Sequence, residues 1–267
     1  MTQNLERAGT PAPAPPPSSP TPTPPSAGPP DRRGVRVWMI LLALSTVAVF
    51  AYVLPPYLGL DPAEATVPLP PEFPAKYAML VGHILFGSIA MVTMCLQVWP
   101  WLRREHPAIH RRSGRLYVFA GVLPSVVLSF YLLVTSFGGP GWVGRASLAA
   151  LWFITTAVGY VRARQRRYQE HRRFMIYSFA LTMEALSGRL LANGLMLAMG
   201  MTPGEIPTEQ AASMMTAAEA SAWLGWVVNL MIAAWWLDGR RSKSKSKSRS
   251  EAKPGAGRGP AATAPSA

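Results

Sequence analysis

Six long runs of mostly apolar residues alternate with shorter polar segments along the chain. Each run is close to the length of about 20 helical residues that is needed to cross the hydrocarbon core of a bilayer. The runs lie at residues 37–54, 77–100, 116–137, 143–161, 174–197 and 220–237. We therefore predict an all-α integral membrane bundle of six transmembrane helices, which excludes a soluble globular enzyme.

Two polar segments flank the six runs. Residues 1–31 are rich in proline and lack an apolar face, so we predict a disordered tail of polyproline type. Residues 239–267 alternate lysine with serine, and we predict a disordered basic tail. The transmembrane domain then covers residues 32–238. In one alternative, these tails recruit partner proteins and the chain is a membrane scaffold.

The basic residues are distributed unevenly between the loops. Of the 26 lysines and arginines, all but Lys76, Arg145 and Arg189 precede the first run, lie in the second-to-third or fourth-to-fifth loop, or follow the last run. Because cytoplasmic loops carry the excess of Lys and Arg, we predict cytoplasmic N- and C-termini in the cell (plasma) membrane. The net charge of +13 then indicates contact with anionic lipid headgroups and not with nucleic acid.

Common catalytic motifs are missing from the sequence. It has no P-loop, no GxGxxG placed after a strand, no HExxH and no nucleophile elbow, so hydrolysis and nucleotide binding have no support. The single cysteine, Cys95, lies in an apolar run, which excludes a disulfide framework and leaves too few thiols for a zinc or iron–sulfur site. Any enzymatic role is at most electron transfer.

Ionisable residues inside the runs are the first candidates for function. His83 lies in the second run, and Glu184 and Arg189 lie in the fifth. The last two are about 140° apart around a helix, so each needs a partner from another helix or a hydrated cavity. We predict an outward-opening polar pocket, which a small-solute or lipid transporter could use. Its residues are His83, Glu184, Arg189, Asn193, Asn229 and Gln97.

The pocket has structural alternatives. Arg189 can extend along its helix toward the outer surface, and Glu184 can be a neutral, hydrogen-bonded acid. Gln97 is equally a candidate for a hydrogen bond between helices.

Two histidines begin similar basic segments at the cytoplasmic ends of the third and fifth runs. His110 and His171 are each followed by two arginines, then a tyrosine and a Phe-Ala pair. Two imidazoles that face each other can hold a haem iron, and neighbouring arginines can pair with its propionates. The leading hypothesis is a ligand or redox group between spans two, three and five, with one b-type haem on His110 and His171 as its most concrete version. The alternative is that both clusters set topology and bind lipid phosphates.

Three blocks of sequence carry a family resemblance. They are His83 with Gly87 and Gln97, HRRSGRLY at 110–117, and HRRFMIYSFAL at 171–181 followed by Arg189. Over residues 77–195 the chain resembles the uncharacterised multi-pass membrane proteins of domain-of-unknown-function family 2306. The resemblance implies an integral membrane location and no established reaction. The matching positions are His83, Gln97, His110, Arg111, Gly114, Arg115, Tyr117, His171, Arg172, Met175 and Arg189.

The chain departs from the family pattern at one place. Phe174 stands where the family often has Trp, and Ile176 and Tyr177 stand where an Arg–Ser pair is common. We therefore expect the cytoplasmic end of the fifth span to differ from that of other members.

Overall fold

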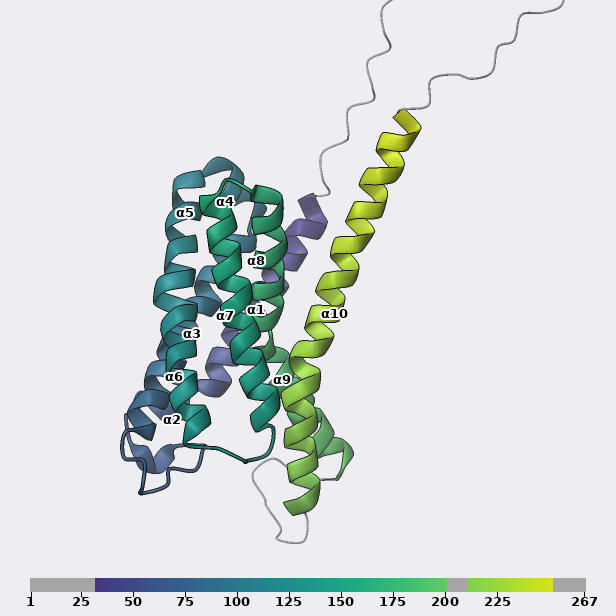
Figure 1. Cartoon of the computed structure of the whole chain (residues 1–267). Coiled ribbons are helices and arrows are strands. Elements are labelled where there is room, and N and C mark those ends of the chain that lie inside the picture. The colour runs from purple at the N-terminus through teal and green to yellow at the C-terminus, as the bar shows by residue number, and fades with distance from the viewer. Residues whose placement is uncertain (1–31, 201–210, 252–267) are drawn as a thin grey trace, which may run out of the picture.

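A computed structural model describes residues 32–200 and 211–251, which are mostly helical (Figure 1). Residues 1–31, predicted as a tail, lie outside the described residues. The elements are α1 (Arg32–Val53), α2 (Pro55–Leu58), the short 3-10 helix η1 (Pro62–Glu64), α3 (Lys76–Val98), α4 (Pro100–Glu105), α5 (Pro107–Leu116), the π-helix η2 (Tyr117–Val122), α6 (Leu123–Val134), α7 (Trp142–Arg164), α8 (Tyr168–Thr182), α9 (Glu184–Ala198) and α10 (Ala211–Glu251).

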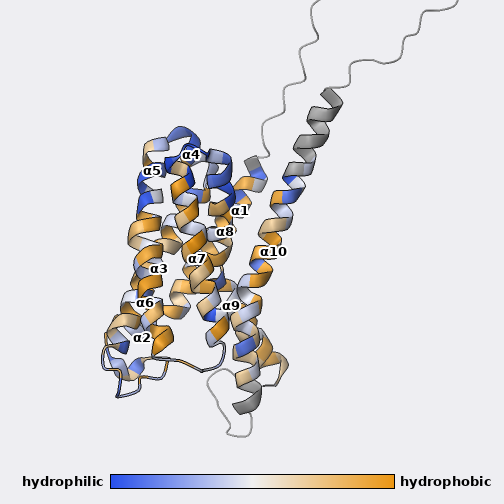
Figure 2. Ribbon diagram, viewed as in Figure 1, coloured by the Kyte–Doolittle hydropathy of each residue, from blue (hydrophilic) through white to orange (hydrophobic). Residues whose placement is uncertain are grey.

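Five helical stretches are long and apolar enough to cross a membrane. They are Arg33–Val53, Lys76–Val98, Pro107–Val134, Trp142–Arg164 and Met215–Arg240. Apolar residues cover the middle of the bundle, whereas hydrophilic residues gather around α4 and the start of α8 (Figure 2). Large apolar side chains such as Leu44, Phe130 and Trp235 are more than half exposed on the outside of these helices. Such a surface is typical of helices surrounded by lipid.

The predicted fifth span, 174–197, differs from a single transmembrane helix. It is divided at Met183 into α8 and α9, each 15 residues long. At 1.5 Å per residue each is roughly 22 Å long, which is short of the ~30 Å hydrocarbon core. The Thr182 hydroxyl donates to the Ser178 carbonyl and the Leu186 N–H donates to the Met183 carbonyl, which tightens the turn. Such side-chain bonds to the preceding turn bend helices, and they leave little trace in hydropathy.

The last helix extends beyond the predicted sixth span. α10 continues to Glu251, inside the segment 239–267 that the sequence predicts as disordered. A helix that is already formed adds residues at little cost, and the lysines and arginines of this segment are good helix formers. Residues 252–267 are not among those that the structure describes.

The third span contains a π-helical segment. Pro124, near the start of α6, lacks the N–H that would bond to the preceding turn, and η2 accommodates this by widening the helix. Within η2, Gly121 faces α3 so closely that an added Cβ would lie 2.8 Å from the Ala90 Cα. This contact brings α3 and η2 together at the centre of the core. The buried residues of this core are Leu42, Val49, Ala90, Met91, Met94, Tyr117, Val122 and Val126.

The helices alternate in direction, so the connections gather at two ends of the bundle (Figure 1). We call the end with α4, the start of α5 and residues 165–167 the basic end, because it carries the arginine clusters. The opposite end, with residues 54–75 and 135–141, is the loop end. α1 begins and α10 ends on the side of the basic end, whereas α8 and α9 in series lead from the basic end toward the loop end (Figure 1).

Candidate functional site

A cavity of about 810 Å³ lies among α1, α3, α6, α7, α9 and the end of α8 and extends to the loop end. Loop residues 67–70 and 135–140 contribute to its wall at that end. The volume is typical of sites for small organic ligands. Most of the wall is apolar, with side chains that include Val49, Phe50, Leu80, Ile84, Leu132, Leu148 and Leu181.

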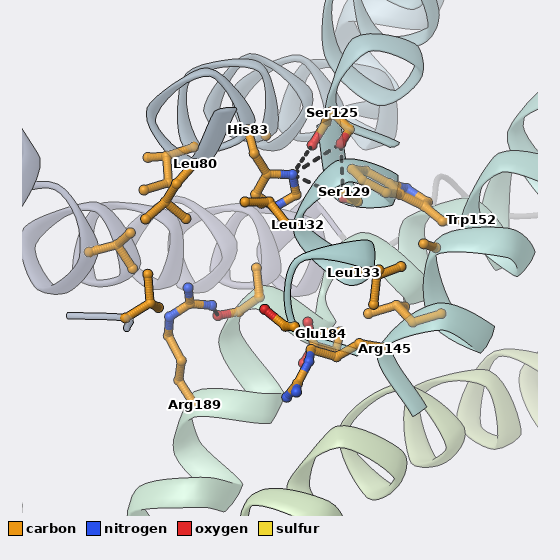
Figure 3. A pocket seen from close by; sticks show the side chains of 18 of the residues that line it. Leu80, His83, Ser125, Ser129, Leu132, Leu133, Arg145, Trp152, Glu184 and Arg189 are labelled. Carbon is orange, nitrogen blue, oxygen red and sulfur yellow. Dashed lines mark hydrogen bonds between the residues drawn. The ribbon is translucent and has the colours of Figure 1, made fainter. Parts of the chain in front are cut away.

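His83 enters the cavity from α3 in a fixed orientation (Figure 3). Its Nδ1 lies 3.0 Å from the Ser125 carbonyl oxygen and 3.1 Å from the hydroxyls of both Ser125 and Ser129. Because a carbonyl only accepts hydrogen bonds, these contacts place the proton of the neutral ring on Nδ1. The Nε2 atom is then the one that can accept a hydrogen bond from a ligand or water.

Four charged side chains also line the cavity, and three of them are cationic. They are Lys76, Arg145, Arg189 and the carboxylate of Glu184. Lys76 Nζ donates to the Thr135 carbonyl at 3.3 Å, Arg189 Nη1 to the Ala185 carbonyl at 2.6 Å, and Arg145 Nη2 to the Pro140 carbonyl. Within the part of the chain that the structure describes, none of the three is in a salt bridge. The cavity therefore holds more positive than negative charge.

Two glycines position Glu184 at the start of α9. A Cβ added at Gly188 would collide with the Glu184 carboxylate, so the absence of a side chain there leaves the space that the carboxylate occupies. A Cβ at Gly225 of α10 would lie 3.0 Å from the Gly188 Cα and 3.5 Å from the Glu184 Cγ. The close approach of α9 and α10 therefore holds Glu184 in place next to the cavity.

The structure brings together three of the six predicted pocket residues. His83, Glu184 and Arg189 line one cavity, whereas Asn193, Asn229 and Gln97 are not among the described residues of its wall. Asn193 is half-buried on α9. For Asn229 and Gln97 the expectation fails because their side chains face other helices.

Asn229 and Gln97 each join two helices. Asn229 Nδ2 donates to the Ala180 carbonyl at 3.1 Å and to the Ser187 hydroxyl at 2.8 Å, which links α10 to α8 and α9. Gln97 Nε2 donates to the His110 carbonyl at 2.8 Å and to the Ser113 hydroxyl at 2.7 Å, which links α3 to α5. The same amide lies 3.1 Å from where a Cβ of Gly114 would be, so Gly114 provides the space for it.

Several residues of the wall were not predicted from the sequence. Lys76 and Arg145 stood out only as exceptions to the distribution of basic residues, and Ser125, Ser129 and Trp152 were not singled out. Serine pairs four residues apart on an apolar helix are a usable signal, since both hydroxyls then lie on one face. Nothing in the sequence indicates that the cavity extends as far as Lys76 and Arg145.

The histidines predicted as haem ligands lie at the basic end, away from this cavity. His171 Nδ1 lies 2.8 Å from the Gly159 carbonyl, so Nδ1 carries the proton and Nε2 is the atom available to a ligand. His110 Nδ1 is buried and has no hydrogen-bond partner among the described residues.

The other signature residues have mixed surroundings. Arg111 and Arg115 are exposed on α5, and Arg172 is exposed on α8, where its guanidinium lies 5.7 Å from the centre of the Trp236 ring. Met175 packs against Gly159, and Tyr117 is buried in the core. Among the residues that the structure describes, no three His, Cys, Asp or Glu side chains form a group that could hold a metal ion.

Comparison with known proteins identifies one matching family. The family model described as "Predicted membrane protein (DUF2306)" matches residues 80–237, from the first turn of α3 into α10. The match is longer than the resemblance over 77–195, because it includes the last span. It contains His83, Arg145, Glu184 and Arg189 and begins after Lys76. No curated protein and no solved structure matches the chain.

Proposed function

Because the chain belongs to the DUF2306 family of membrane proteins, we propose that its cavity binds an amphipathic anion, as the substrate site of a lipid or small-solute transporter. The observation that carries this proposal is the composition of the wall. Lys76, Arg145 and Arg189 face a largely apolar space that contains one carboxylate, Glu184.

The excess of cationic groups favours an anionic ligand. A charge inside the bilayer region costs several kcal/mol unless it is paired or hydrated. Each of the three cationic side chains bonds to a backbone carbonyl, which orients it, and nearby carboxyl groups offset the charges of Arg145 and Arg189 only in part, without a close ion pair among the described residues. A carboxylate or phosphate group that enters the cavity supplies the missing negative charge, and guanidinium groups bind such groups with two N–H donors.

The apolar part of the wall favours a ligand with a hydrocarbon tail. α1 contributes Val49, Phe50 and Val53 to the cavity. Its outer side carries exposed Leu41, Leu44 and Val47, so α1 stands between the cavity and the region where lipid tails lie. A ligand with its anionic headgroup near Arg189 and its hydrocarbon tail along α1 matches both the cationic and the apolar parts of the wall.

We also propose six crossings, with the basic end in the cytoplasm and the loop end outside. The support is that α8 and α9 in series lead from the basic end toward the loop end (Figure 1). α8 packs against α7 and α10, and α9 packs against α10, so neighbouring helices shield both of them. The arginine clusters agree with this orientation, since they favour the cytoplasmic side. The cavity then opens to the outside.

The binding proposal is tested by thermal unfolding of the purified full-length chain in a neutral maltoside detergent. Laurate and dodecyl phosphate should raise the unfolding temperature, because a ligand at about 100 times its Kd adds ~2.7 kcal/mol to the free energy of unfolding. Dodecylammonium has the same tail and the opposite charge, and it should not. Equal responses to the anions and the cation would contradict the proposal, since the tail alone would then be responsible.

A second candidate function is electron transfer through a haem at the basic end. The observation that favours it is the bond between His171 Nδ1 and the Gly159 carbonyl, because metal-bound histidines usually donate their other ring N–H in this way. His171 and His110 would hold the haem iron, and the neighbouring Arg111 and Arg172 would pair with the propionates. A Soret band that His171→Ala abolishes would support this function, and a colourless protein from haem-replete cells would exclude it.

A further inference from the structure

A row of four hydroxyl groups crosses the core between η2, α7 and α8. Thr182 Oγ1 lies 2.9 Å from Tyr117 Oη, which lies 2.6 Å from Ser178 Oγ, which in turn lies 2.6 Å from Thr156 Oγ1. Between 0% and 7% of each residue is exposed. We call these four residues the hydroxyl relay.

Two hydroxyls of the relay differ from the usual behaviour of hydroxyls in this bundle. Ser45, Ser88 and Thr155 donate to the carbonyl four residues earlier in their own helix. Thr156 and Ser178 instead bond to a hydroxyl on another element, and either oxygen of each pair can be the donor. Thr182 donates to the Ser178 carbonyl and accepts from Tyr117, so its O–H must rotate away from that carbonyl for a proton to pass along the row.

One end of the relay reaches the cavity. Thr182 and Trp152 both line the cavity wall. Trp152 Nε1 donates to Thr182 Oγ1 at 3.0 Å and to Tyr117 Oη at 3.4 Å, which holds the two hydroxyls in position. Water in the cavity can therefore exchange a proton with Thr182.

The other end of the relay points toward His171 at the basic end. Thr156 lies one helical turn, about 5 Å, before Gly159 on α7. The Gly159 carbonyl accepts the hydrogen bond from His171 Nδ1. Met175, on α8 between His171 and Ser178 in sequence, packs against the same Gly159, since a Cβ at Gly159 would lie 2.8 Å from its Sδ.

We propose that the hydroxyl relay conducts protons between the cavity and His171, and that the Met175 side chain closes the path at the basic end. Each hydroxyl accepts a proton from the preceding oxygen and releases its own to the next one, so no electron moves and no oxygen keeps a net charge. When the flexible Met175 side chain moves aside, water joins Thr156 to His171. The proposal is independent of which ligand the cavity binds.

Proton flux into liposomes tests the relay. The full-length protein is reconstituted with an internal pH-sensitive dye, and a potassium gradient with valinomycin drives the protons. Met175→Ser removes the closing side chain and supplies a hydroxyl, so it should raise the flux at least about tenfold over the wild type, the effect of a barrier lower by ~1.4 kcal/mol. Adding Tyr117→Phe or Thr156→Val to Met175→Ser should return the flux to the level of empty liposomes.

The matched control is Thr155→Val in the same Met175→Ser background. Thr155 neighbours Thr156 on α7, but its hydroxyl donates only to carbonyls of its own helix. This variant should conduct as well as Met175→Ser alone. The proposal is overturned if Met175→Ser liposomes match empty ones, or if their flux survives both Tyr117→Phe and Thr156→Val. Either result would leave the hydroxyls as cross-links between helices.

Discussion

Replacing Arg189 with alanine should weaken the binding of laurate about thirtyfold. Truncating one partner of a buried charge pair costs about 2 kcal/mol or more, and each 1.4 kcal/mol is a factor of ten in Kd. Arg189 lines the cavity and is in no salt bridge in the described part of the chain, so the nearby Glu184 offsets its charge only in part and its loss removes attraction for an anion. The Kd is measured by titration of the purified protein in neutral detergent.

A variant at Glu184 should have the opposite effect. Glu184→Gln removes the only carboxylate among the described residues of the wall and keeps the shape of the side chain. It should tighten laurate binding about tenfold, because the repulsion between two carboxylates disappears. A variant that merely damages the fold cannot produce tighter binding.

An exposed arginine outside the cavity provides the control for both variants. Arg164 ends α7 at the basic end, and Arg164→Ala should leave the Kd unchanged. If Arg189→Ala and Glu184→Gln shift the Kd in the same direction, the cavity does not select its ligand by charge.

The second large effect concerns the contact between η2 and α3. Gly121→Val should lower the free energy of unfolding by about 3 kcal/mol, which is the upper part of the range for overpacked cores. An added Cβ would lie 2.8 Å from the Cα and 2.9 Å from the N of Ala90, and the backbone of α3 cannot move aside as a side chain can. In a chain of this size the unfolding temperature should fall by roughly 10 °C.

The matched substitution is Gly194→Val on α9. A Cβ at Gly194 would meet nothing within 4 Å, so only the difference in helix propensity remains. That difference favours valine slightly, and the unfolding temperature should not fall. If the two variants unfold at the same temperature, close contact between η2 and α3 is not what holds the third span in the core.

The sequence predicted the helices well because hydropathy reports directly on the environment of a helix in lipid. It did not predict the division at Met183 or the π-helix, because both depend on individual hydrogen bonds. Thr182 bends its helix by bonding back to Ser178, and Pro124 widens η2 by lacking a donor. Neither effect changes the mean hydropathy of a run.

The candidate site was predicted only in part, because hydropathy does not fix the direction of a side chain. His83, Glu184 and Arg189 stand out against apolar neighbours, whereas depth alone does not say which way a side chain faces. Asn229 was placed in the pocket from its depth, yet its amide bonds to Ala180 and Ser187 at a helix interface. The sequence does not show how the loops run around the cavity, so it could not place Arg145 in the same wall.

The most direct test of the central claim is cysteine labelling of intact cells, because the claim is that an anion-binding cavity opens outside. Cys95→Ser provides the background, into which Ser136→Cys in the cavity wall or Ser242→Cys on α10 is introduced. A membrane-impermeant maleimide should label Ser136→Cys in intact cells, more slowly when laurate is present, and should reach Ser242→Cys only after permeabilisation. Labelling of Ser242→Cys in intact cells, or labelling of Ser136→Cys that laurate leaves unchanged, would contradict the account.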